Sequence, residues 1–177
     1  GEAARARVLV VIPTLNEAEN IVATLLALAP LAARGAQCIV VDDGSTDDTV
    51  QRARAHAERV IVTARGRASQ MNGGAAAAGG AALLFLHADT RLPANADRII
   101  ADALASHQWG RFDIRIDEAG TWPALVAWFM NWRSRLSGIA TGGPAMFMRR
   151  NAFERLGGFA AIPLMEDIEM SRRLKSL

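Results

Sequence analysis

Two patterns of apolar residues alternate along the chain. Short continuous apolar runs closed by turn residues are typical of strands buried on both faces of a sheet. Apolar residues three and four positions apart are typical of helices with one buried face. The strands predicted in this way cover residues 8–12, 38–41, 60–62, 83–86, 112–116 and 145–148. Helices are predicted to follow Asn16, Ser45, Gly66 and Pro93. Further helices are predicted over residues 122–136, 151–156 and 165–177.

Capping residues predict where the first helices begin. Asn16 with Glu19 three residues later, and Ser45 with Asp48, both have the spacing of a capping pair. Pro30 is expected to end the first helix, because proline lacks the backbone N–H that a helix interior needs.

Four strand-then-helix units in succession predict an α/β fold. A crossover helix between parallel strands packs back onto the sheet, so the expected architecture is Rossmann-like, with a mostly parallel sheet flanked by helices on both faces. A chain of 177 residues is long enough for one core, and we expect a single domain over residues 1–177.

The charge balance does not indicate a nucleic-acid partner. The chain has 20 basic and 18 acidic residues, a net charge of +2, yet its pI is about 9.5. Lys175 is the only lysine, and the sequence has no tyrosine and one cysteine. Little therefore titrates between neutrality and the guanidinium range, so a small arginine excess raises the pI.

Cysteine usage and hydropathy bear on the compartment. Cys38 is the only cysteine, which excludes a disulfide framework and fits a reducing compartment. Residues 1–7 lack the apolar core of a signal peptide, and no uncharged stretch reaches the roughly 20 residues that span a bilayer. We expect a cytoplasmic protein.

Peripheral contact with the inner face of the cell membrane is a subsidiary hypothesis, since Trp122, Trp128 and Trp132 share a predicted helix with arginines. The plainer interpretation is that these tryptophans form a buried stripe in the core.

Polar residues follow each of the first four predicted strands. Ligands of parallel α/β sheets bind beyond the carboxyl ends of the strands, so we expect these side chains to gather in one cleft. They are Thr14, Asn16 and Glu17 after the first strand, Asp42 and Asp43 after the second, Arg65 and Arg67 after the third, and His87 and Asp89 after the fourth.

The polar residues after the second predicted strand and those after the third each have two interpretations. Residues 42–45 form a turn and a helix cap, or Asp43 accepts hydrogen bonds from a ribose or a base. Arg65 and Arg67 precede a predicted helix, where guanidinium groups and backbone N–H groups would bind phosphate oxygens; the alternative is that they are solvated loop residues. The stretch matches neither a P-loop nor a dinucleotide fingerprint.

Metal binding and proton transfer are predicted from two acidic motifs. His87 and Asp89 lie two residues apart on an extended segment, and Mg²⁺ or Mn²⁺ bound by one carboxylate and phosphate oxygens would neutralise a diphosphate. Glu166 and Asp167 open the last predicted helix. They either compensate its dipole or supply a general base.

Four segments, taken in order, resemble the successive motifs of family 2 glycosyltransferases with the GT-A fold. They are residues 11–17 (VIPTLNE), 41–47 (VDDGSTD), 72–74 (NGG) and 85–89 (FLHAD). A closer resemblance is to the small bacterial subgroup of radical-SAM/selenodomain-associated transferases, through residues 66–68, 86–90, 110–113 and 164–169. The resemblance covers nearly the whole chain.

The resemblance implies an inverting, metal-dependent transfer of a sugar from a UDP- or GDP-type nucleotide sugar to an unknown acceptor hydroxyl. It implies a nucleotide-binding half at about residues 8–92 and an acceptor half at about 93–177. It places Asp89 on Mg²⁺ or Mn²⁺, and it makes Asp167, beside Glu166, the base that deprotonates the acceptor. The donor-binding residues that it implies are Pro13, Thr14, Asn16, Glu17, Asp43, Arg65, Arg67, Asn72, His87 and Ala88.

Three motifs depart from the family's pattern. The family's D-x-D is H-x-D here, with His87 first, a feature that the subgroup shares. Met71 stands where the family has an arginine before Asn72, which leaves the arginines of the preceding loop for phosphate. Gly143 and Pro144 stand where the subgroup has an Asp-Gln pair, on the presumed acceptor side.

Two other functions remain open at this point. A nucleotidyltransferase could use a similar sheet and metal, although the loop at Gly66 follows the third predicted strand and not the first. A catalytically inactive nucleotide-sugar binding module would explain the loss of the polar pair at residues 143–144. Because the family tends to continue past its last acidic helix, we expect the domain to extend beyond Leu177.

Overall fold

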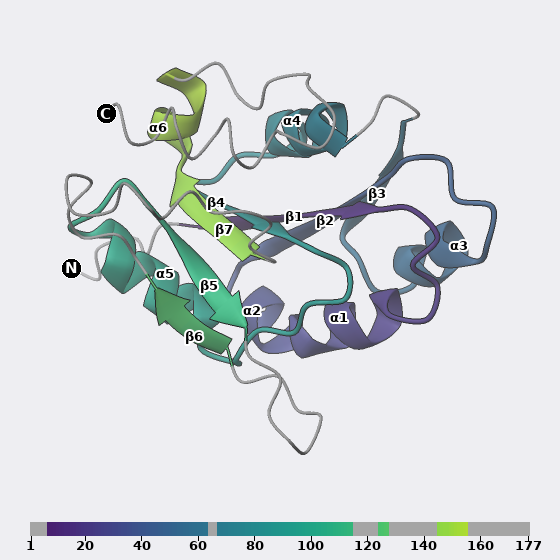
Figure 1. The fold of residues 1–177 in the computed structure, drawn as a ribbon, viewed down its shortest axis with the longest axis horizontal. Coiled ribbons are helices and arrows are strands. Elements are labelled where there is room, and N and C mark those ends of the chain that lie inside the picture. Colours follow the sequence, from purple (N-terminus) through teal and green to yellow (C-terminus); the bar gives the residue numbers. More distant parts are fainter. Residues whose placement is uncertain (1–6, 64–66, 115–123, 128–144, 156–177) are drawn as a thin grey trace.

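Seven strands form one mixed sheet in the computed structural model, which describes residues 7–63, 67–114, 124–127 and 145–155 (Figure 1). The strands are β1 (Val8–Thr14), β2 (Gln37–Asp42), β3 (Arg59–Val62), β4 (Ala82–Leu86), β5 (Trp109–Ile114), β6 (Ala124–Ala127) and β7 (Ala145–Arg149). Their order across the sheet is β3-β2-β1-β4-β7-β5-β6. The first four strands pair in parallel, and β7, β5 and β6 extend the sheet antiparallel from β4.

Helices cover both faces of the sheet. They are α1 (Ile21–Ala27), α2 (Ala29–Ala33), α3 (Thr49–Arg54), α4 (Arg67–Ala77), α5 (Ala96–Leu104) and α6 (Arg150–Arg155). Figure 1 shows α4 and α6 on one face and α1, α2, α3 and α5 on the other. The predicted α/β architecture is therefore confirmed.

Strand β1, in the interior of the sheet, is buried on both faces, as its continuous apolar run predicts. Residues 8–12 are at most 4% exposed. Val10 and Ile12 pack in the apolar cluster that includes α1, α2 and α5, whereas Leu9 and Val11 pack in the cluster that includes α4 and α6. Successive side chains of a strand point to opposite faces, so one strand contributes to both cores.

Helix α4 approaches the sheet closely at Gly74. A Cβ atom on Gly74 would lie 2.3 Å from Cγ1 of Val11 and 3.0 Å from Cγ2 of Val41. Gly73, its neighbour in the predicted motif, has open space around its Cα. The second glycine is therefore required by the packing of helix against sheet.

The predicted capping of the first helices is wrong. Helix α1 begins at Ile21 and not directly after Asn16, and α3 begins at Thr49. Asn16 has a left-handed backbone (φ 54°), and its side-chain oxygen accepts a hydrogen bond from the N–H of Thr46 in the facing loop. The Ser45 hydroxyl is likewise bound within the loops. Contacts between loops thus replace the expected helix caps.

Pro30 does not end the first helix. That helix ends at Ala27, and Pro30 lies in the first turn of α2. Backbone N–H groups of a first turn have no partner within the helix, so a proline is tolerated there.

The helix predicted over residues 122–136 is wrong for residues 124–127, which form β6. This strand pairs antiparallel with β5, with Val126 opposite Phe112. A short apolar run such as Ala-Leu-Val-Ala fits either element by periodicity, and the pairing with β5 decides between them. The rest of that predicted helix and the one at 165–177 lie outside the described residues.

Within the described part of the chain, none of the helices has both the length and the apolar character required to cross a bilayer.

Candidate functional site

The carboxyl ends of β1, β2 and β4 surround one cavity of about 290 Å³. Its lining residues are Pro13, Thr14, Leu15, Glu17, Asp43, Gln70, His87, Ala88 and Asp89. Side chains predicted from three separate strand ends therefore meet, as expected for a parallel sheet. The half-buried Asn72 and the exposed Asn16 are not among the lining residues.

The two adjacent carboxylates after β2 have different surroundings. Asp42 is fully buried, and its oxygens accept hydrogen bonds from the Thr14 hydroxyl (2.8 Å), from the N–H groups of Gly44 (3.0 Å) and Ser45 (2.7 Å), and from the Ser45 hydroxyl. These donors satisfy the buried charge. Asp43 is half-buried and lines the cavity. Asp42 thus shapes the turn, and Asp43 is placed to meet a ligand.

Gln70, a cavity residue that the sequence interpretation missed, ties the ends of two strands together. Its amide nitrogen donates to the carbonyl oxygens of Val41 (2.8 Å) and Thr14 (3.1 Å), and the residue is 3% exposed. The available signal was its spacing, since Gln70 lies one helical turn before Gly74 and therefore on the face of α4 that meets the sheet.

Met71, where the family pattern has an arginine, belongs to the core. It is 2% exposed and packs in the cluster that joins α4 to the sheet. Arg65, predicted to contact phosphate, lies outside the described residues. Arg67 begins α4, and its side chain is also outside the described part.

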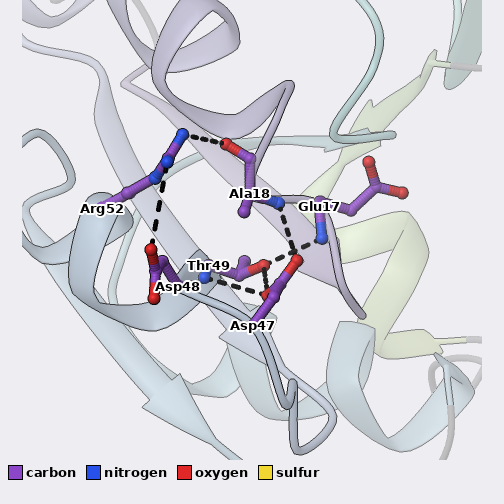
Figure 2. A network of polar contacts seen from close by, with 6 residues as sticks. All are labelled: Glu17, Ala18, Asp47, Asp48, Thr49 and Arg52. Atoms are coloured by element: carbon purple, nitrogen blue, oxygen red, sulfur yellow. Dashed lines mark hydrogen bonds and ion pairs between the residues drawn. The ribbon is translucent and has the colours of Figure 1, made fainter.

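The loop after β1, which carries Glu17, is fastened to the loop after β2 (Figure 2). The N–H of Glu17 donates to Oγ1 of Thr49 over 2.8 Å, and the N–H of Ala18 donates to Oδ2 of Asp47 over 3.2 Å. Hydrogen bonds from the Thr49 hydroxyl and from backbone N–H groups hold the pKa of Asp47 below its usual range. Asp47 therefore remains charged at neutral pH and retains these donors.

The turn after β4 presents His87 and Asp89 at the cavity. The N–H of Thr90 donates to the carbonyl oxygen of His87 over 3.0 Å, and the Thr24 hydroxyl of α1 donates to the carbonyl oxygen of Ala88. Ala88 is buried, His87 is half-buried and Asp89 is exposed. The turn is thus anchored at its buried centre, with the two polar side chains near its surface.

The side chains that line the cavity suit a divalent cation whose coordination is completed by a bound ligand. Its described lining includes three carboxylates, on Glu17, Asp43 and Asp89, and the imidazole of His87. Among the described residues, no three histidine, cysteine or acidic side chains are grouped closely enough to hold a metal ion by themselves. Mg²⁺ and Mn²⁺ bind through one or two carboxylates plus phosphate oxygens, so these residues fit a cation that arrives with a diphosphate.

A larger cavity of about 520 Å³ involves α5, β7 and α6. Arg149 and Arg150 line it, but their guanidinium groups donate to backbone carbonyl oxygens, Arg149 to Leu104 and Arg150 to Ala75 and Ala78. These arginines brace neighbouring elements. None of the residues predicted to bind a donor, metal or acceptor lines this cavity.

Asp167 and Glu166, predicted to act as the base, lie outside the described residues.

Sequence comparisons assign most of the chain to one family. The model of the family Glycosyl transferase family 2 matches residues 9–157. An uncharacterised glycosyltransferase of Mycobacterium tuberculosis and one of Mycobacterium bovis are each 33% identical over 162 residues, which cover 85% of this chain and 71% of the relative.

Solved structures share the fold at low sequence identity. A mannosyltransferase from Pyrobaculum calidifontis, in complex with GDP-Man and Mn²⁺, superimposes with a TM-score of 0.75 at 20% identity, over 97% of this chain and 52% of that one. TarS of S. aureus with UDP-GlcNAc gives 0.76 at 18% identity, over 96% and 53%. Glucosyl-3-phosphoglycerate synthase of M. tuberculosis, with Mn²⁺, UDP and glucosyl-3-phosphoglycerate, gives 0.70 at 21%, over 94% and 64%. The chain thus spans between half and two thirds of the length of these structures.

Proposed function

The chain belongs to glycosyl transferase family 2, and from this premise we propose that it transfers a sugar from a nucleoside-diphosphate sugar to an acceptor hydroxyl. We propose further that the transfer inverts the anomeric centre and requires Mg²⁺ or Mn²⁺. The membership favours this function over nucleotidyl transfer, the alternative that the sequence left open.

One observation carries the proposal: Glu17, Asp43, His87 and Asp89, from three strand ends, line a single cavity. Carboxylates at the first two positions can accept hydrogen bonds from ribose hydroxyls or from N–H groups of a base. A divalent cation held there would offset the negative charge of the donor's diphosphate. Asp89, with His87 beside it, is the residue proposed to hold that cation.

Each group has a defined part in the proposed reaction. The cation would supply a positive charge that stabilises the leaving diphosphate. Asp167 would accept the proton of the acceptor hydroxyl as that oxygen forms a bond to the anomeric carbon and the bond from this carbon to the phosphate oxygen breaks. The displacement is a single step, so a covalent sugar–protein intermediate is not needed.

The donor is proposed to be a UDP- or GDP-sugar. Structures that share the fold contain UDP-GlcNAc, UDP or GDP-Man. Because these proteins have low sequence identity to this chain, its own cavity determines which nucleotide it binds. The acceptor is a hydroxyl compound, and we propose no narrower class.

Thermal unfolding with a panel of UDP-, GDP- and dTDP-sugars in the presence of Mn²⁺ tests donor binding. At least one donor should raise the Tm of the protein, and Asp43→Asn should reduce that rise. A folded protein that responds to none of the donors would refute the proposal.

Asp167→Asn separates an enzyme from an inactive binding module. This variant should retain the donor-induced rise in Tm and lose sugar transfer, because the amide cannot accept the proton. Transfer that is unaffected by the substitution would remove Asp167 from the proposed role.

A further inference from the structure

The backbone of Glu17 and Ala18 is held by side chains of the loop and helix that follow β2. The N–H groups of Glu17 and Ala18 donate to Thr49 and Asp47, and Nη1 of Arg52 donates to the carbonyl oxygen of Ala18 over 3.0 Å. Figure 2 shows the Glu17 carboxylate pointing away from these contacts. The network therefore fixes the backbone of Glu17, while its carboxylate lines the cavity and accepts a hydrogen bond from the Asn20 amide over 3.3 Å.

Asp47 orients the hydroxyl group of Thr49. Oδ1 of Asp47 accepts the N–H of Thr49 over 3.0 Å and also accepts the Thr49 hydroxyl. Thr49 is fully buried, and its hydroxyl has one hydrogen to donate. With that hydrogen directed to Asp47, the oxygen is oriented to accept the N–H of Glu17.

We propose that Asp47 is a positioning residue for the donor site, which sets the separation of the Glu17 and Asp43 carboxylates. Asp43 lies four residues before Asp47 in the same loop. The N–H groups of Glu17 and Ala18 are bonded to Thr49 and Asp47, next to the contacts that Asn16 makes with Ser45 and Thr46. Asp47 itself is exposed and is not among the described residues that line the cavity. The inference rests on the proposed function, in which Glu17 and Asp43 contact the nucleoside.

Whether nucleotide binding weakens or strengthens when the charge of Asp47 is removed distinguishes a positioning role from a purely electrostatic one. A negative charge near a nucleoside diphosphate repels it, so removing the charge of Asp47 would strengthen binding or leave it unchanged if charge alone acted. Loss of position predicts weaker binding. Asp48 offers a matched control, because it carries the same charge one residue later and its exposed side chain makes a 3.9 Å ion pair with Arg52.

Titration calorimetry with UDP and with GDP, each with Mn²⁺, tests the inference. Asp47→Ala should weaken the affinity for the bound nucleotide roughly fivefold or more, and Asp48→Ala should change it less than about twofold. A double-mutant cycle with Glu17→Ala isolates the route of the effect: in the Glu17→Ala background, Asp47→Ala should have almost no further effect.

Three outcomes would overturn the inference. They are an unchanged affinity in Asp47→Ala, an equal loss in Asp48→Ala, and a loss of the same size in the Glu17→Ala background. Wild-type protein that binds neither nucleotide would overturn the proposed function, and the inference with it; binding by wild type and by Asp47→Ala alike would overturn the inference alone.

A second pair of variants covers the case in which Asp47→Ala does not fold. Thr49→Ser retains the hydroxyl that accepts the Glu17 N–H and should bind nucleotide as wild type does. Thr49→Val removes that hydroxyl at nearly constant volume and should reproduce the loss. Equal affinities in the two variants would contradict the positioning role.

Discussion

Thr14 and Asp42 join the carboxyl ends of the two neighbouring strands β1 and β2. The Thr14 hydroxyl donates to Oδ1 of Asp42 over 2.8 Å in a buried contact, and the two residues lie opposite each other in the parallel register. Because Asp42 also accepts the N–H groups of Gly44 and Ser45, the same carboxylate organises the turn that brings Asp43 to the cavity.

This arrangement predicts that the two adjacent aspartates differ when substituted. Asp42→Ala leaves the buried Thr14 hydroxyl and the part-buried donors of Gly44 and Ser45 without an acceptor, and should lower the free energy of unfolding by about 2–4 kcal/mol. Asp43→Ala, at a half-buried position, should lower it by less than about 1 kcal/mol while weakening nucleotide binding. Urea denaturation and calorimetry measure the two effects. Equal destabilisation by the two variants would argue against the separation of roles.

The adjacent glycines of α4 form a second matched pair. Gly74→Ala places a Cβ atom against Val11 and Val41 and should destabilise the protein by about 1–3 kcal/mol. Gly73→Ala meets open space in a helix and should stabilise the protein by about 0.5–1 kcal/mol. Thermal denaturation of both variants checks the signs. A Gly74→Ala variant as stable as wild type would show that α4 can move away from the sheet at little cost.

Asp89 should account for the effect of the metal on nucleotide affinity. Asp89→Asn retains the size of the side chain but loses the charge that a hard divalent cation requires. We expect Mn²⁺ to increase the affinity of wild type for UDP or GDP relative to EDTA, and we expect this increase to disappear in the variant. Asp102→Asn, an exposed carboxylate on α5, is the control. An unchanged response to Mn²⁺ in Asp89→Asn would place the cation elsewhere.

Cys38 should be unreactive in the folded protein. It is buried in β2, and burial raises the pKa of its thiol from 9.0 to about 11. At neutral pH, labelling by a maleimide should be slow in the native state and rapid in urea.

The same shift predicts a dependence of stability on pH. The unfolded chain ionises the Cys38 thiol first, so the contribution of this group to stability is complete below pH 9 and should fall as the pH rises toward about 11. Cys38→Ser lacks a group that titrates in this range, and its stability should vary less there. Parallel pH profiles of the two proteins would contradict the assignment.

The sequence by itself determined the parallel half of the sheet and the residues around its cavity. A strand buried on both faces needs apolar side chains at every position, which is a strong local signal at β1, β2 and β4. Since the carboxyl ends of parallel strands lie at one edge, Glu17, Asp43, His87 and Asp89 could be expected to meet once the strands were recognised.

Only the tertiary structure decided which contacts each polar residue makes. Asn16 and Ser45 suit helix caps in the sequence, yet in the fold they, like Asp47, make contacts between loops about 30 residues apart. Residues 124–127 became a strand because β5 offered an unpaired edge, and Gln70 became part of the site because α4 lies over two strand ends. Each outcome depends on a partner that is distant in sequence, and local pattern contains no information about that partner.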